Sequence, residues 1–314
     1  MRIGIALSTF ASEPQTTNVV DRAIEIGRQA AETGIDTVWL AQMTGYDAVG
    51  LAALVGLAVP EIRIGTSVVP IHPRHPIMLA AGAKTAQAAT GGRFQLGVGL
   101  GSAWLSSNAY GVEYPPPTKH LREYLTALRP LLAGRDDPFE GETVTSRPFA
   151  PTAVAGSEPE IPLLVAAMGP QALRVTGELA DGTIPYLAGP RALGDHIVPA
   201  ITKAAEQAGR PAPRIVGAIP IVVTDEPEQA RARAIDMAAF YETIPSYRRV
   251  LDLEGVERAG EVFVIGDEES VAAQLRRYVD AGITEITLSQ TNMLGPEAEL
   301  RTWRLGVEFG RSVS

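Results

Sequence analysis

Short apolar runs alternate along almost the whole chain with longer segments that have a helical period. Strands that alternate with helices form parallel sheets, because each crossover helix returns the chain to the same edge. Eight such units favour an α/β fold closed as a (β/α)8 TIM barrel over an open doubly wound sheet. The expected strands are residues 2–7, 37–41, 62–69, 93–99, 162–167, 182–186, 214–223 and 283–289.

The length of 314 residues suits one barrel of this kind, so we expect a single domain over 1–314. Two stretches are longer than a connection between a strand and its helix requires. Residues 102–160 contain a predicted helix and a possible hairpin, and we expect them to form an insertion over the carboxyl-terminal face of the barrel. Residues 224–262 contain another helix and are expected to form a lid-like region.

Composition and charge limit the partners of this chain. The formal net charge of -9 argues against binding to nucleic acid, because a phosphate backbone requires an opposing basic surface. No apolar run is long enough to span a membrane, and no signal-peptide pattern opens the chain. The absence of cysteine excludes disulfides and fits a reducing cytoplasm, where we expect the protein to reside. Any anionic ligand must then be held by arginine or by backbone amides.

The carboxyl ends of the strands, where barrel enzymes place their active sites, carry few ionisable side chains. They show no carboxylate pair, the four histidines lack the spacing of a metal site, and the three lysines fall in predicted helices. Metal hydrolysis and Schiff-base catalysis are therefore disfavoured, and we predict no metal site. A rim of small residues favours a bound cofactor that performs the chemistry. The expected strand ends are Ser8–Thr9, Gln42–Met43, Ser67–Val68 with His72, Leu100–Gly101–Ser102, Ala167–Met168–Gly169, Tyr186–Leu187 and Ser289–Gln290.

Two glycine-containing turns can offer backbone amides to a ligand. In GGRFQLGVGLGSAW, Gly99 and Gly101 either relieve crowding inside a narrow barrel or let the backbone approach a planar ring or an anion. In AAMGPQALRVTGELADG, Pro170 suits the first turn of a helix whose free amides can receive a phosphate. Neither turn is the dinucleotide fingerprint, because GVGLGS lacks the final glycine of that motif.

These two motifs, together with TSVVP and RHP in the third unit, resemble the luciferase-like (β/α)8 flavin and deazaflavin oxidoreductases. The resemblance covers nearly the whole chain, including HLREYLTALRPLL and FVIGDEESVAAQLRRYVDAGITEITL. MRIGIAL, GIDTVW and TSV are most similar to the branch that uses coenzyme F420, a deazaflavin hydride carrier. The resemblance implies an F420-dependent oxidoreductase that acts on a small organic molecule and forms a homodimer.

The resemblance also implies a cofactor site built mostly from backbone. The third strand would end in a bulge with a non-prolyl cis peptide bond at Ser67-Val68, against which the deazaflavin ring packs. Residues 101–103 would approach the ring or ribityl chain, and 167–169 would present amides to the phosphate. Arg74 either contributes to a positive channel for the anionic tail of F420 or is a solvated surface side chain. The implied cofactor contacts are Gln42, Ser67, Val68, Arg74, Leu100, Gly101, Ser102, Ala103, Ala167, Met168 and Gly169.

This chain departs from the F420-dependent sugar-phosphate dehydrogenases of that family at the positions used for proton transfer. Those enzymes have an Asp-His pair after the second strand, where this chain has Gln42-Met43, and a glutamate where Ser102 stands. Neither Gln42 nor Met43 can take a hydroxyl proton, so a reductase is favoured over an alcohol dehydrogenase. His72 and Tyr186 are candidate proton donors, although His72 also suits a solvated or capping role and Tyr186 a packing role at the rim.

The sequence leaves two alternatives open. One is an FMN-dependent luciferase-like monooxygenase, which requires a reductase partner that supplies reduced flavin and a dry pocket that protects an oxygen adduct. The other is a non-catalytic flavin-fold protein, which binds a ligand without turnover and has no need of the missing acid–base residues. Measuring whether the protein binds FMN or F420 separates the first alternative from the F420-dependent oxidoreductase. Measuring whether bound F420 turns over separates the second.

Overall fold

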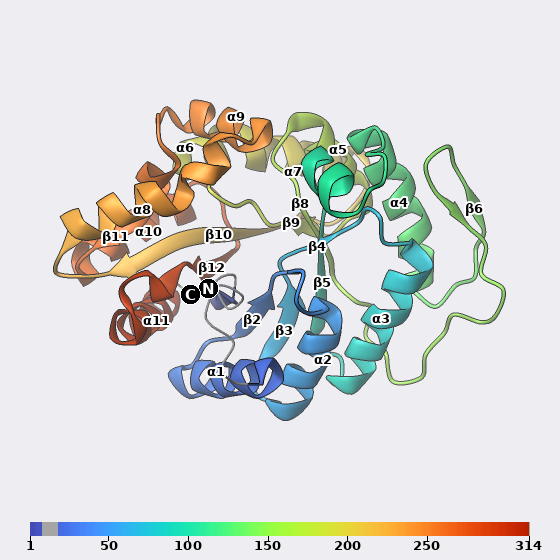
Figure 1. Ribbon diagram of the computed structural model, residues 1–314, viewed down its shortest axis with the longest axis horizontal. Coiled ribbons are helices and arrows are strands. Elements are labelled where there is room, and N and C mark those ends of the chain that lie inside the picture. The colour runs from blue at the N-terminus through green and yellow to red at the C-terminus, as the bar shows by residue number, and fades with distance from the viewer. Residues whose placement is uncertain (8–17, 314) are drawn as a thin grey trace.

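The computed structural model describes residues 1–7 and 18–313, so the predicted strand end Ser8–Thr9 lies outside the described residues. Eight parallel strands close into a barrel that helices surround (Figure 1). Pairing of the last strand with the first closes the sheet, and the predicted TIM barrel is confirmed. In their order around the barrel the strands are β1 (Arg2–Leu7), β2 (Thr37–Leu40), β3 (Arg63–Thr66), β5 (Phe94–Gly99), β8 (Leu163–Ala166), β9 (Gly182–Thr183), β10 (Arg214–Val223) and β12 (Glu285–Ser289).

The outer layer consists of helices that follow the strands in turn. The first of them is capped by Asn18, whose side chain accepts a hydrogen bond from the N–H of Val20, and it ends at Gly34 with φ 93°. None of the helices among residues 1–7 and 18–313 combines the length and the apolar character that crossing a membrane requires. The layer contains α1 (Val19–Thr33), α2 (Ala48–Ala58), α3 (Pro76–Ala89), α4 (Pro117–Leu132), α5 (Pro170–Leu179), α7 (Val198–Gln207), α10 (Glu268–Asp280) and α11 (Pro296–Ser312).

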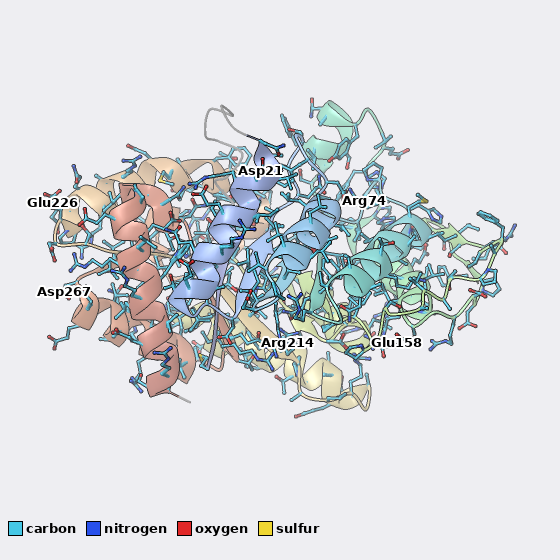
Figure 2. All side chains as sticks on the ribbon, turned by 90° about the horizontal axis from the view of Figure 1, so that it is seen from below. Asp21, Arg74, Glu158, Arg214, Glu226 and Asp267 are labelled. Atoms are coloured by element: carbon cyan, nitrogen blue, oxygen red, sulfur yellow. The ribbon has the colours of Figure 1, made fainter. Side chains whose placement is uncertain are left out.

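A polar cluster closes the amino-terminal end of the barrel. Arg214 donates to both carboxylate oxygens of Glu285, at 2.6 and 2.9 Å, and to Oε1 of Gln95 at 2.6 Å. These three residues belong to β10, β12 and β5, so the cluster bridges strands that are not all neighbours. In Figure 2, Arg214 lies in the lower half of the view and Arg74, which follows β3, in the upper half. Because this cluster fills the amino-terminal end, a ligand site is expected at the opposite, carboxyl-terminal end of the strands.

Two predicted strands are divided or shortened in the structure, and one observed strand was not predicted. The predicted strand 62–69 divides into β3 and β4 (Val69–Pro70), because the chain leaves the sheet between them. The predicted strand 182–186 contains only β9 and then a single bridge from Tyr186 to Ala218. The sequence did not predict β11 (Val264–Gly266), which pairs with residues 221–223 of β10. Three apolar residues are too few to show the period of a strand.

The segment 102–160 lies mostly beside the barrel rather than over it. Helix α4 packs between α3 and α5, because its apolar face completes the outer layer. The hairpin of β6 (Phe139–Glu140) and β7 (Thr145–Ser146) lies at the outer edge of the molecule (Figure 1). Of the residues in this segment, Ser102, Tyr114, Pro117 and Thr118 line the cavity at the carboxyl-terminal end of the barrel. The expected insertion over this face is therefore much shorter than the 102–160 assigned to it.

The segment 224–262 contains α8 (Pro227–Glu242) and α9 (Pro245–Glu254). It lies on the same side of the molecule as the short helix α6 (Pro190–Ala192), which packs against α9 (Figure 1). The start of α9 reaches the carboxyl-terminal end of the barrel, where three of its residues and the preceding Ile244 line the cavity described below. The expected lid-like region thus contributes one wall of that cavity. The remaining helical turns are residues 105–109, 193–197, 259–262 and 291–294.

Candidate active site

A cavity of about 690 Å³ opens at the carboxyl-terminal end of the barrel. Its walls come from the ends of β4, β5 and β8, from the chain after β9, and from the first residues of α4, α5 and α9. Barrel enzymes place their active sites at this end, and the volume is that of a typical ligand site. The predicted site residues that line it are Val68, Leu100, Gly101, Ser102, Ala167, Met168, Gly169 and Tyr186.

The chain between β3 and β4 forms a bulge beside the cavity. Gly65 pairs with Gln95 and Val69 pairs with Val98, so residues 66–68 stand opposite residues 96–97. The side chain of Thr66 replaces the missing ladder bonds: its Oγ1 donates to the carbonyl of Gly97 at 2.8 Å and accepts from the N–H of Gly97 at 3.0 Å. The Ser67-Val68 peptide bond is cis, as expected.

Hydrogen bonds to the end of β2 hold this bulge in place. The N–H of Ser67 donates to the carbonyl of Leu40 at 2.8 Å, and the N–H of Gln42 donates to the carbonyl of Val68 at 3.3 Å. The side-chain amide of Gln42 is also used locally, because Nε2 donates to the carbonyl of Tyr46 at 2.6 Å and Oε1 accepts from the N–H of Ala48 at 3.0 Å. Gln42 therefore shapes the loop behind the bulge and does not line the cavity.

The glycine-rich end of β5 combines the two roles considered for it. At Gly99 an added Cβ would lie 2.7 Å from Cγ2 of Val68, so this glycine relieves crowding beneath the bulge. Gly101 has φ 74° and an added Cβ would meet only Pro70, at 3.7 Å, so its backbone turns into open space. Ser102 accepts a hydrogen bond from the N–H of Leu105 at 3.1 Å, which directs its hydroxyl group to the following helical turn.

The start of α5 presents free backbone amides to the cavity. Gly169 precedes the helix with φ -81° and ψ 148°, and no side chain among the described residues caps it. Pro170 occupies the first turn, and the next residues, Gln171 and Ala172, also line the cavity. The first N–H groups of a helix have no partner within the helix and carry the positive end of its dipole. This edge of the cavity can therefore hold a phosphate or another anion.

Tyrosines from three segments gather on the opposite side. The ring of Tyr186 lies 5.3 Å from that of Tyr241 and 6.1 Å from that of Tyr247, and Nε2 of Gln290 donates to the Tyr186 hydroxyl at 3.4 Å. Burial, assisted by the neighbouring Tyr241, raises the pKa of Tyr186 well above its ordinary value. Tyr186 therefore keeps its proton at neutral pH, and its hydroxyl group can donate a hydrogen bond at the cavity wall.

Comparison with known proteins identifies the family of this fold and site. The family model described as luciferase-like monooxygenase matches residues 1–285. The chain belongs to this family. The predicted resemblance to the luciferase-like oxidoreductases is therefore confirmed, and membership supports an enzyme.

Relatives of this luciferase-like chain include users of both cofactors considered above. An F420-dependent glucose-6-phosphate dehydrogenase of Kineococcus radiotolerans is 28% identical over 291 residues, which cover 82% of this chain and 83% of the relative. The solved F420-dependent tetrahydromethanopterin reductase of Methanopyrus kandleri has a TM-score of 0.76 at 20% identity and covers 98% of this chain and 97% of its own. The FMN-bound oxygenating constituent of 3,6-diketocamphane monooxygenase of Pseudomonas putida has a TM-score of 0.76 at 16% identity, covering 97% and 96%. The two structural likenesses show the fold alone.

Five predicted residues of this luciferase-like chain lie outside the cavity lining, namely Gln42, Ser67, His72, Arg74 and Ala103. Gln42 and Ser67 support the bulge from behind. The guanidinium of Arg74 lies 2.8 Å from the carboxylate of Asp47 and contributes to a separate surface hollow beside it. The positive charge of Arg74 is therefore balanced within the loop after β2 and not directed into the cavity.

His72 lies behind the wall of the cavity, next to the lining residue Tyr114. The two rings are nearly perpendicular, with centroids 6.2 Å apart, and the ring of His120 lies 5.5 Å from His72 on the other side. Burial, and then the proximity of His72, lowers the pKa of His120, which favours its neutral form. Nε2 of His72 is buried with no partner among the described residues. His75 caps α3, because its Nδ1 accepts the N–H of Ile77.

The sequence patterns predicted the start of α5 at the site, but they did not predict that α4 and α9 also add walls to the cavity. The lining residues that were not predicted include Tyr114, Gln171, Tyr247 and Arg249. All three helices start with proline, which is a usable signal for a helix start. Proline marks where a helix begins, but it does not reveal toward which strand end that helix points.

Proposed function

We propose that this luciferase-like chain is an F420-dependent oxidoreductase that reduces a small organic acceptor. The observation that carries the proposal is one cavity in which the bulge at Val68, the open backbone of Gly101 and the uncapped start of α5 face the same space. A planar ring fits against the bulge and the glycine backbone, and a phosphate fits the free amides of α5. When bound, F420 supplies or accepts a hydride. The Kineococcus relative, named for the same cofactor, supports this choice.

A reductase agrees better with the polar groups of the cavity than an alcohol dehydrogenase does. Oxidation of an alcohol requires a base for the hydroxyl proton, and no carboxylate or histidine occurs among the described lining residues. Gln42 cannot titrate, and the hydroxyl of Ser102 already accepts the N–H of Leu105. Reduction of an activated double bond needs only a proton donor. The candidate donor is Tyr186, which lines the cavity and keeps its hydroxyl proton at neutral pH.

Titration with the two cofactors tests this proposal. We expect F420 to bind at least about tenfold more tightly than FMN, a difference of about 1.4 kcal/mol, measured by quenching of protein fluorescence. Tight binding of FMN with no detectable binding of F420 would establish the monooxygenase alternative, together with its need for a reductase partner. Tight binding of F420, with no oxidation of its reduced form across a panel of electrophilic acceptors, would instead favour the non-catalytic alternative.

The homodimer implied by the resemblance stays a prediction. Sedimentation equilibrium of the purified protein checks it, with a mass near 66 kDa expected for two copies of the 33.2 kDa chain (2 × 33.2). A mass of one chain at micromolar concentration would count against a dimer.

A further inference from the structure

The described residues that line the cavity include one charged side chain. Among its described lining residues Arg249 is the only Asp, Glu, Lys or Arg, in a chain whose net charge is -9. Arg249 lies on α9, is exposed, and forms no ion pair with any described residue. Its neighbour Arg248, in contrast, contacts Asp252 at 2.8 Å and donates to the carbonyls of Val256 and Glu257. Arg248 therefore holds the helix end together, whereas the charge of Arg249 is available to a ligand.

The remaining walls around Arg249 are mostly apolar. Val68, Leu100 and Met168 lie beside the bulge and the proposed ring site. Ile184, which packs in one buried cluster with Val68, and Ile244, which precedes α9, add two further aliphatic side chains. The rings of Tyr186 and Tyr247 face the same space, with their planes at 85° to each other. Such a lining favours a flat, apolar body, because aromatic rings and branched aliphatic side chains cannot satisfy many polar groups. A single guanidinium at the rim favours one carboxylate or phosphate on that body.

We propose that the acceptor of this enzyme is a flat, unsaturated molecule with one anionic group, which Arg249 binds at the rim of the cavity. This inference rests on the proposed function and names the substrate class for it. In a conjugated double bond next to a carbonyl, the hydride of reduced F420 forms a new C–H bond at one carbon. The electron pair of the double bond then takes a proton at the other carbon, so the acceptor gains two electrons and F420, which also loses a ring N–H proton, is oxidised.

The anionic group could come from two sources, the acceptor or the tail of F420. Arg249 and the start of α5 line the cavity from different elements, so the cavity offers two groups that can hold negative charge. Arg249 is two residues from Tyr247, whose ring lies 6.1 Å from that of Tyr186, the candidate proton donor. We assign Arg249 to the acceptor on this ground. The experiment below measures both ligands, so that the two sources give different results.

Binding of cinnamate and of its neutral counterpart cinnamamide tests the assignment. Both are flat and unsaturated, and only cinnamate has a charge. We expect isothermal titration at low ionic strength to show cinnamate binding at least about tenfold more tightly, and Arg249→Gln to abolish that preference. Arg249→Lys should keep most of it. The matched control is Arg231→Gln on α8, which removes one exposed, ion-paired charge away from the cavity and should leave the preference unchanged.

Three results would overturn the inference. The first is an equal affinity of the wild-type protein for the two probes, and the second is no detectable binding of either up to their solubility limits. The third is a loss of F420 affinity in Arg249→Gln with the cinnamate preference intact, which would assign Arg249 to the cofactor tail. The titrations are run with and without F420. Failure of F420 to bind would refute the proposed function. The preference for cinnamate over cinnamamide in the cofactor-free protein tests the role of Arg249 independently of F420.

Discussion

The change Gly169→Asp is expected to weaken F420 binding by about two orders of magnitude without destabilising the fold. Gly169 has φ -81° and ψ 148°, which suit any residue, and an added Cβ would meet nothing within 4 Å. Aspartate is a preferred residue before a helix, because its carboxylate accepts the first N–H groups. It would thus occupy the amides proposed for the phosphate and repel it. Two like charges 4 Å apart repel by about 4 kcal/mol at an effective dielectric constant near 20. Screening by salt lowers this repulsion, which leaves the expected loss of about two orders of magnitude in affinity.

Gly169→Asn is the matched control for this change. Asparagine caps a helix about as well as aspartate and has nearly the same size, but it is neutral. We expect Gly169→Asn to lose less than about tenfold in F420 affinity. The asparagine side chain still competes with the phosphate for the backbone amides, but it does not repel the phosphate. Fluorescence titration gives the affinities, and thermal unfolding gives the stabilities. Equal affinity of Gly169→Asp and wild type, or equal losses in both variants, would show that no negative charge binds at the start of α5.

The sequence predicts the barrel well because its strands and helices are encoded locally. An apolar run such as 214–223 is buried on both faces in a parallel barrel, and β10 has the same bounds in the structure. The same holds for backbone features such as Gly34, whose left-handed conformation ends α1, and Pro170, which starts α5. The position of the cavity follows from the fold, since the ends of parallel strands meet at one edge.

Side-chain partners are not encoded locally, and here the sequence predicts less. Arg74 and Asp47 are 27 residues apart, and nothing in either neighbourhood indicates that they form an ion pair. The amide of Gln42 is bound by the loop that follows it, so its identity alone did not reveal whether it faces the cavity. Arg249 lies on a helix far in sequence from the strand ends next to it. Its contribution to the cavity depends on how α9 packs, which only the three-dimensional structure shows.

The change Gly97→Ala is expected to lower the free energy of unfolding by about 3 kcal/mol or more, which is a large effect for one methyl group. An added Cβ would lie 2.0 Å from the carbonyl oxygen of Thr66 and 2.9 Å from Cδ1 of Ile184. Because the first of these atoms belongs to the backbone, β3 and β5 must move apart. That movement would break the two buried hydrogen bonds between Thr66 and Gly97.

Urea unfolding measures this loss, with Gly45→Ala as the control, because a Cβ at Gly45 meets nothing within 4 Å and should change stability by less than about 0.5 kcal/mol. A stability of Gly97→Ala equal to that of Gly45→Ala would mean that the sheet tolerates the separation of β3 from β5.

The change Gly97→Ala also tests how the bulge between β3 and β4 is supported. Thr66 is the residue before the Ser67-Val68 peptide, so displacement of β3 shifts the proposed shelf for the cofactor ring. Gly97→Ala should therefore lose F420 affinity even where it stays folded, whereas a change that only destabilised the barrel would leave the affinity of the folded fraction unaltered.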